Sequence, residues 1–250
     1  MAAAKRILAI DAGNTRIKWG VSDGSKWDPG GATPTREAEG LAHLWARVGK
    51  VAAAIASNVA GPGIRREIER ACTTWDWPLT VIEPQPQQLG VTNGYRDHRQ
   101  LGPDRWAALI ASHHGYPGHK LVVNAGTALT VDALLADGQF LGGLIVPGPA
   151  LMRRALDNAT AGLRPARAST EGRFDAFPVR TPDAIFSGAI QACVGAVERM
   201  RASMAAGGCP PERVILSGGA AGEIAPHLPL EHALNENLVL DGLALIARDA

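Results

Sequence analysis

The chain has 250 residues, 46% of them hydrophobic, which is enough for two domains of ordinary size, each with its own core. Lys and Arg number 25 and Asp and Glu 24, so the net charge of +1 lacks the basic excess of a protein that binds nucleic-acid phosphates. No apolar run reaches the ~18 residues of a membrane span, the first residues lack the apolar stretch of a signal peptide, and the three cysteines form no CxxC pair. We therefore expect a cytoplasmic protein with reduced thiols and without nucleic-acid or membrane partners.

Short apolar runs alternate along the chain with longer segments of helical spacing. Residues 22–35 are rich in Gly, Pro and Ser and predict a surface connection or the end of a hairpin. Pro103 suits the first position of a helix, and Thr181 and Gly207 suit the N-cap and the stop of the longest helix. Interleaved strands and helices predict an α/β fold with a mixed sheet. In chain order, the sequence predicts strands over 6–10 and 17–21, a helix over 35–48, strands over 51–56 and 79–83, a helix over 103–114, strands over 121–123, 129–134 and 140–146, a helix over 182–206 and a strand over 213–216.

Two segments of the chain resemble each other. Residues 7–18 read ILAIDAGNTRIK and residues 120–131 read KLVVNAGTALTV. Each is a short apolar strand followed by Asp11 or Asn124, then Ala-Gly, a small polar step and a second strand. Together with the chain length, this pattern predicts a duplication, with one domain over 1–112 and another over 113–250.

The first of these segments has the chemistry of a phosphate-binding turn. Gly13 lets a phosphate approach the backbone, and its neighbours offer side-chain donors. Arg16 and Lys18 are two residues apart on a strand and therefore place positive charge on one face. Asp11 can hold a hydrated Mg²⁺ that bridges the phosphates, although the same pattern also fits a simple β-hairpin turn. The predicted ATP-binding residues of this turn are Asp11, Ala12, Gly13, Asn14, Thr15, Arg16, Ile17 and Lys18.

Two further glycine turns extend the predicted nucleotide site. Gly126 and Thr127 of the second repeat are expected on the other side of the same phosphate chain, so that two turns clamp the polyphosphate across an interdomain cleft. Residues 216–220, LSGGA, follow a predicted strand and suit close approach to the nucleoside. These patterns by themselves predict nucleotide-dependent phosphoryl transfer.

Five motifs in chain order resemble those of a known family: DAGNTRIKWG (11–20), LGPDRWAALIA (101–111), NAGTALTVD (124–132), GGLIVPG (142–148) and TPDAIFSG (181–188). They are similar to motifs of the actin, heat-shock chaperone and sugar-kinase superfamily, and more closely to those of type III pantothenate kinases. The resemblance implies duplicated ribonuclease-H-like (actin-type) α/β domains with an interdomain cleft. It also implies a homodimer that transfers phosphate from ATP to pantothenate, the first step of coenzyme A synthesis, with Mg²⁺ and K⁺ or NH₄⁺ as cofactors.

The resemblance gives Asp104 the role of general base for the substrate hydroxyl. Gly102 and Pro103 precede it at a predicted helix N-terminus, where free backbone N–H groups favour anions. A structural alternative is that Asp104 only stabilises the start of the helix and that Arg105 forms a surface ion pair.

The resemblance also implies the residues that hold pantothenate, which are Gly102, Pro103, Asp104, Arg105, Tyr95 and Thr181. Arg105 would donate charge-assisted hydrogen bonds to the polar end of the substrate. Tyr95 would line the pocket, although half-buried packing is the usual role of a tyrosine. Thr181 matches a position that reaches the substrate of the neighbouring subunit, and its hydroxyl equally suits the helix N-cap.

Asn124 departs from the family pattern, in which an Asp at this position is associated with the monovalent cation. An amide oxygen still coordinates a hard cation, but more weakly than a carboxylate. The resemblance therefore implies K⁺ or NH₄⁺ at Asn124 with reduced support from the protein.

Two other functions remain open from the sequence. One is a different small-molecule kinase of the superfamily, against which the LGPDRW motif argues. The other is a non-catalytic regulatory protein that retains the fold, against which the presence of Asp11, Asp104 and Thr127 argues.

Overall fold

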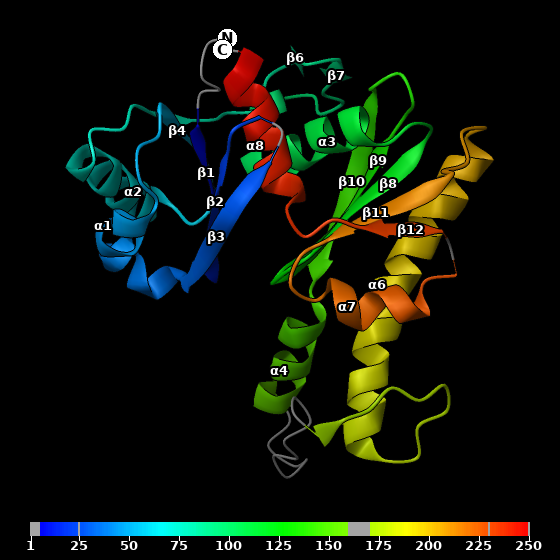
Figure 1. Cartoon of the computed structure of the whole chain (residues 1–250). Helices are drawn as coiled ribbons and strands as arrows, with labels where there is room; N and C mark the ends of the chain where they lie inside the picture. The colour runs from blue at the N-terminus through cyan, green and yellow to red at the C-terminus, as the bar shows by residue number, and fades with distance from the viewer. Residues whose placement is uncertain (1–5, 25, 160–170, 230, 250) are drawn as a thin grey trace. The chain divides into compact units, whose positions relative to one another are not determined.

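The computed structural model describes residues 6–24, 26–159, 171–229 and 231–249 (Figure 1). Its contacts divide the chain into two compact units. One unit runs to Gly115 and resumes at Asn237, and the other runs from Tyr116 to Glu236. No helix in the described residues combines the length and the apolar character needed to cross a bilayer.

The first unit is built on a five-stranded mixed sheet of order β3-β2-β1-β4-β5. β1, β2 and β3 are antiparallel neighbours, whereas β4 and β5 run parallel to β1. The inward-facing side chains of β1, β2 and β4 form a core with Trp45, Ile68 and Trp77. The strands are β1 (Ile7–Ala12), β2 (Arg16–Ser22), β3 (Trp27–Pro34), β4 (Ala53–Asn58) and β5 (Leu79–Val81), and a small separate sheet pairs β6 (Gln87–Gln88) with β7 (Val91–Thr92).

The helices of the first unit include one that is almost wholly buried. Residues 105–112 of α3 are all buried, because α3 packs against β4 and along the full length of α8. Gly242 of α8 permits this approach, since a Cβ there would overlap the Ala107 backbone of α3. The helices are η1 (Thr35–Gly40), α1 (Leu41–Leu44), η2 (Trp45–Arg47), α2 (Pro62–Thr74), η3 (His98–Gln100), α3 (Pro103–Gly115) and α8 (Leu238–Asp249).

The second unit repeats the sheet of the first. Its order is β10-β9-β8-β11-β12. Strands β8, β9 and β10 have the same lengths as β1, β2 and β3, respectively. Asp11 and Asn124 are each the fifth residue of a six-residue strand with the same pattern of buried side chains, which confirms the predicted duplication. The elements are β8 (Lys120–Ala125), β9 (Ala128–Leu134), β10 (Phe140–Pro147), α4 (Pro149–Ala159), α6 (Thr181–Ala206), β11 (Arg213–Ser217), α7 (Ala221–Ile224), η4 (Ala225–His227) and β12 (His232–Leu234).

Three expectations about local structure differ from what is observed. Residues 27–34 of the expected surface connection form strand β3, whose Gly30 and Gly31 leave room for Trp19 because a Cβ at either would overlap that residue. The expected helix over 35–48 is broken into η1, α1 and η2, with non-helical dihedral angles at Glu37. The expected second domain, 113–250, included α8, whereas α8 packs against α3 and β1 of the first unit.

Candidate active site

Hydrogen bonds fix the backbone of the turn between β1 and β2. The Gly13 N–H donates to the Arg16 carbonyl at 3.0 Å and closes the turn. From the start of η1, the Thr35 hydroxyl donates to the Gly13 carbonyl at 2.7 Å, and the Thr35 N–H donates to the Thr15 carbonyl at 3.0 Å. Asn14 and Thr15 therefore form an exposed tip on a fixed backbone, which is the geometry expected of a phosphate turn.

The side chains around this turn divide into a core set and an outward set. Ala12 and Ile17 are fully buried in the core, so only their backbones can face a ligand. Arg16 is exposed, Lys18 is half-buried, and both alternate with the buried Ile17 and so share the opposite face. Lys18 pairs in register with Asp11, which places the ammonium group on the side of that carboxylate.

The carboxyl group of Asp11 has a raised pKa. Burial raises its pKa, the negative charge of Asp104 raises it further, and the Ser57 hydroxyl and the charge of Lys18 partly counteract both, so that the pKa reaches about 6. The Ser57 hydroxyl donates to Asp11 Oδ1 at 2.8 Å from the neighbouring strand β4, where it is fully buried. Asp11 and Asp104 thus form a pair of close carboxylates, of the kind expected beside a bound cation.

Asp104 lies in the first turn of α3. Burial raises its pKa, while the backbone N–H groups of Arg105 and Asp104 and the charge of Arg105 oppose that rise. Gly102 leaves the space that this carboxylate occupies, because a Cβ at Gly102 would overlap Asp104 Oδ1. The helix itself begins there, since the Trp106 N–H donates to the Gly102 carbonyl at 3.0 Å.

Arg105 and Tyr95 form a contact beside Asp104. Arg105 is only 4% exposed, and its Nη1 donates to the Tyr95 hydroxyl at 2.9 Å. Its guanidinium also lies 5.6 Å from the centre of the Tyr95 ring. Arg105 is therefore not the surface ion pair of the structural alternative but part of a part-buried polar cluster.

Asn93 holds the loop that carries Tyr95. Its Oδ1 accepts from the Tyr95 N–H at 3.1 Å, and its Nδ2 lies 3.4 Å from the carbonyl oxygens of Gln85 and His98. These bonds connect both ends of a segment that has little regular structure of its own. The position of Tyr95 therefore depends on Asn93.

The second glycine turn joins β8 to β9 at the position that corresponds to the first, but it is one residue shorter. The Gly126 N–H donates to the Ala128 carbonyl at 2.9 Å, whereas the Gly13 N–H donates to the carbonyl of Arg16, three residues on. Gly126 is half-buried and Thr127 is exposed. Gly148 packs directly on this turn, because its N–H donates to the Thr127 carbonyl at 2.8 Å and a Cβ on it would overlap the Gly126 carbonyl.

The third glycine element lies beside the second turn. Residues 216–220 lead from β11 into α7, as predicted, and the Ala220 N–H donates to the Ala125 carbonyl at 2.9 Å. Gly218 has φ +95°, and a Cβ on it would lie 2.5 Å from the same carbonyl oxygen. Glycine is therefore required at Gly218 both for its backbone conformation and for the close approach.

Asn124 lies in a row of polar residues across three strands. It pairs with Thr130 on β9 and with Ser217 on β11, so the three side chains share one face of the sheet. The buried Thr130 hydroxyl has no hydrogen-bond partner among the residues that the structure describes. In the same described part of the chain, no three His, Cys, Asp or Glu side chains come together as a metal site.

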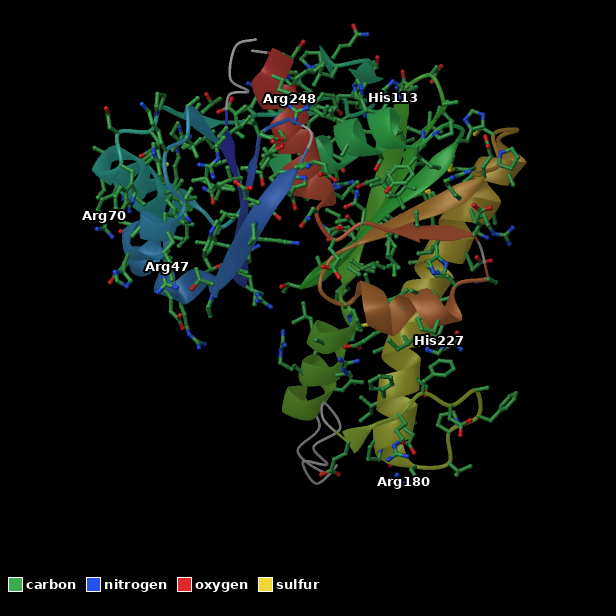
Figure 2. All side chains as sticks on the ribbon, in the orientation of Figure 1. Arg47, Arg70, His113, Arg180, His227 and Arg248 are labelled. Carbon is green, nitrogen blue, oxygen red and sulfur yellow. The ribbon has the colours of Figure 1, made fainter. Side chains whose placement is uncertain are left out.

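Thr181 does not act as the predicted N-cap. It is the first residue of α6, and the N-cap is Arg180, which Figure 2 labels at this end of the helix. No side chain among the described residues caps this end. An open hollow of about 620 Å³ lies along α4 and the start of α6, and Thr181 lines it together with Arg180, Met152 and Ile185. The Thr181 hydroxyl therefore does not cap the helix. Capping does not compete with the contact to the substrate of the neighbouring subunit that the resemblance implies.

Three supporting residues were missed by the sequence reasoning. Ser57 is the first polar residue after the predicted strand over 51–56. Its place at the end of that strand, like the place of Asp11 at the end of an earlier one, was the available signal. Gly148 belongs to a motif that had been noted without a role, and Asn93 lies two residues before Tyr95 without any sign of its three contacts.

The same mixed sheet occurs twice in this chain, and each copy has a glycine turn after its first strand. This arrangement defines an actin-like α/β protein. Among solved structures, a conserved Campylobacter jejuni protein assigned to the Baf family of transcriptional activators matches with a TM-score of 0.61 at 20% identity, over 97% of this chain and 98% of that one. A Listeria monocytogenes protein described as an N-acetylmannosamine kinase matches with a TM-score of 0.55 at 12% identity, over 98% of this chain and all of that one. At such identities these matches show the fold alone.

The sequence comparisons are more specific. The family model of type III pantothenate kinases matches residues 7–203. A type III pantothenate kinase of Nitrosospira multiformis is 42% identical over 97% of this chain and 91% of its own length. One of Aromatoleum aromaticum is 44% identical over 97% and 98%. The chain belongs to the type III pantothenate kinase family.

Proposed function

We propose that this chain transfers the γ-phosphoryl group of ATP to the hydroxyl group of pantothenate, giving ADP and 4'-phosphopantothenate in the first step of coenzyme A synthesis. Besides family membership, one observation carries the proposal: the charge of Asp104 on α3 reaches Asp11 at the phosphate turn and raises its pKa. Phosphoryl transfer to an alcohol needs one group at the phosphates and another at the hydroxyl, and these two carboxylates are suited to that division.

Asp104 acts as the general base in this proposal. Burial raises the pKa of its carboxyl group, which makes the carboxylate a stronger proton acceptor than an exposed aspartate. The N–H groups at the start of α3 and the charge of Arg105 oppose that rise in pKa and so favour the ionised carboxylate. The hydroxyl proton moves to a carboxylate oxygen of Asp104 as the new O–P bond forms and the bond from the γ-phosphorus to ADP breaks.

Asp11 suits a hydrated Mg²⁺. Its carboxylate is buried next to a second negative charge, so a divalent cation beside it would offset both unfavourable effects. When bound, Mg²⁺ supplies charge neutralisation on the phosphates. The backbone at Gly13 and the side chains of Asn14, Thr15, Arg16 and Lys18 bind the phosphates, while Ala12 and Ile17 anchor the turn in the core. Gly126, Thr127 and residues 216–220 contribute further backbone donors and room for the nucleotide.

Pantothenate is held near the start of α3. Arg105 and Tyr95 are already joined at 2.9 Å and present a cation and a hydroxyl to the polar end of the substrate. Gly102 and Pro103 shape the backbone that precedes Asp104.

Thr181 completes the site from the partner subunit of a homodimer. The apolar side chains of Leu156 and Val179 support this arrangement, because both line the hollow beside Thr181 and yet are 45% and 95% exposed. Sedimentation equilibrium tests the dimer, and a monomer at micromolar concentration would contradict it. We place the enzyme in the cytoplasm, where we expect its three cysteines to remain reduced.

A monovalent cation, K⁺ or NH₄⁺, binds at Asn124. The amide oxygen of Asn124 and the hydroxyls of Thr130 and Ser217 form a set of neutral oxygen donors, and the unpartnered Thr130 hydroxyl supports a ligand there. Neutral donors bind more weakly than a carboxylate, so we expect activation only at millimolar concentrations or above.

The test is ADP release from ATP and Mg²⁺, with and without pantothenate, in Na⁺, K⁺ or NH₄⁺ buffers. We expect turnover that depends on pantothenate and rises with K⁺ or NH₄⁺. Asp104→Asn should lower kcat by about 10²–10⁴-fold, the usual contribution of a general base, with an unchanged circular dichroism spectrum. Glu69→Gln, which changes an exposed carboxylate on α2, is the matched control. Full turnover in Asp104→Asn would refute the base, and ADP release indifferent to pantothenate would refute the substrate.

A further inference from the structure

An ion pair between α4 and α7 has no part in the site described so far. Arg153 Nη1 donates to Glu223 Oε2 at 2.8 Å, and Nη2 lies 3.4 Å from Oε1. The Arg153 side chain is 7% exposed and that of Glu223 is 40% exposed. The guanidinium also lies 4.8 Å from the centre of the Phe186 ring on α6. An arginine so deeply buried is fixed in one geometry, unlike the exposed ion pairs within α2.

The arginine end of this pair is connected to the second glycine turn. Gly148 immediately precedes α4, and its carbonyl accepts from the Met152 N–H at 3.0 Å in the first turn of that helix. The same residue donates to the Thr127 carbonyl and leaves no space for a Cβ against Gly126. A shift of α4 therefore moves the Gly126–Thr127 turn with it.

The glutamate end is connected to the third glycine element. The Glu223 N–H donates to the Ala220 carbonyl at 3.1 Å, and the Ala220 N–H donates to the Ala125 carbonyl at the end of β8. α7 has only four residues and so makes few helical hydrogen bonds of its own. Its position depends on contacts such as the one to Arg153 on α4.

These contacts form a closed ring within the second unit, from the Gly126–Thr127 turn through α4, the ion pair and α7 back to Ala125. We propose that Arg153 and Glu223 are a positioning pair that fixes the spacing between the phosphate turn and the nucleoside element, and so sets the affinity for ATP. The inference depends on the proposed function, in which both elements bind ATP. Neither residue touches the reacting atoms, so their effect is on nucleotide binding and not on the chemical step.

Glu223→Ala is the main test, because it changes a part-exposed side chain and leaves Arg153 in its place. We expect the Kd of Mg-ATP, measured by calorimetry, and the KM for ATP to rise by about 5–30-fold, in the range of coupling between residues in contact. The KM for pantothenate and kcat at saturating ATP should not change. Arg153→Met keeps the contact with Phe186 and should have the same effect, and the double variant should be no worse than either single variant.

Arg201→Met provides the control. It breaks an ion pair of similar length with Glu198 in the same unit, on a part of α6 that adjoins neither glycine element, and should leave both KM values unchanged. If Glu223→Ala lowers only the melting temperature, or raises both KM values alike, the pair is merely structural and the inference is wrong. If the wild-type protein binds no ATP, the proposed function is wrong. If the wild-type protein and Glu223→Ala bind ATP with equal affinity, only the positioning role is wrong.

Discussion

Replacing Asp11 by Asn should make the metal-free protein more stable, although it removes the proposed Mg²⁺ ligand. The raised pKa of Asp11 means that the folded state binds its proton more tightly than the unfolded chain does. Ionisation of Asp11 therefore destabilises the folded state progressively as the pH rises from about 4 to about 6. Asn carries no charge at any of these values, and its amide oxygen can still accept from the Ser57 hydroxyl.

The magnitude follows from the two pKa values. A rise from 3.8 to about 6 corresponds to about 3 kcal/mol at 1.36 kcal/mol for each pKa unit. Allowing for a weaker bond between Asn and Ser57, we expect Asp11→Asn to gain about 2–3 kcal/mol at pH 8, or about 4–10 °C in Tm for a chain of this size. Most of the gain should be lost at pH 4, where the carboxyl group is protonated in the folded state and only about half ionised in the unfolded chain.

Tryptophan fluorescence during urea unfolding, in EDTA, measures the stability of the unit that contains Asp11. Every tryptophan of the protein lies in this first unit, namely Trp19, Trp27, Trp45, Trp75, Trp77 and Trp106. Glu39→Gln, an exposed carboxylate in the same unit, should change the stability by no more than about 0.5 kcal/mol. A gain of equal size at pH 4 and pH 8, or no gain at pH 8, would refute the electrostatic explanation.

Two further variants test the substrate side of the site. Gly102→Ala should lower kcat by about 10–100-fold, because a Cβ would displace the Asp104 carboxylate and small misplacements of catalytic groups are costly. Gly115→Ala, at the other end of α3 with open space around it, should leave kcat unchanged, and equal rates in the two variants would contradict this role of Gly102. Asn93→Ala should raise the KM for pantothenate by about 5–50-fold with little change in the KM for ATP, since it releases the loop of Tyr95. Asn93→Asp retains the acceptor for the Tyr95 N–H and should recover most of the loss, whereas a rise in both KM values would contradict a specific role for Asn93.

The sequence by itself determined most of the longer strands, the duplication and the position of the candidate site motifs. Strand ends, glycine turns and the start of α3 are set by residues close together in the chain, so their patterns are visible without the fold. Asp11 and Asn124 could be paired across the repeat because both follow at least three apolar residues in short strands. Their chemical difference, one charged and one neutral, was equally visible.

Only the tertiary structure decided the environment of these residues. Burial and the charge of Asp104 on α3 raise the pKa of Asp11, whereas the Ser57 hydroxyl on β4 lowers it, and nothing near position 11 in the chain encodes the approach of these two residues. Gly30 and Gly31 looked like turn residues but are strand residues that make room for Trp19, and α8 packs with the first unit although it ends the chain. Burial, charge proximity and close packing are set by distances between remote segments, which local sequence patterns do not contain.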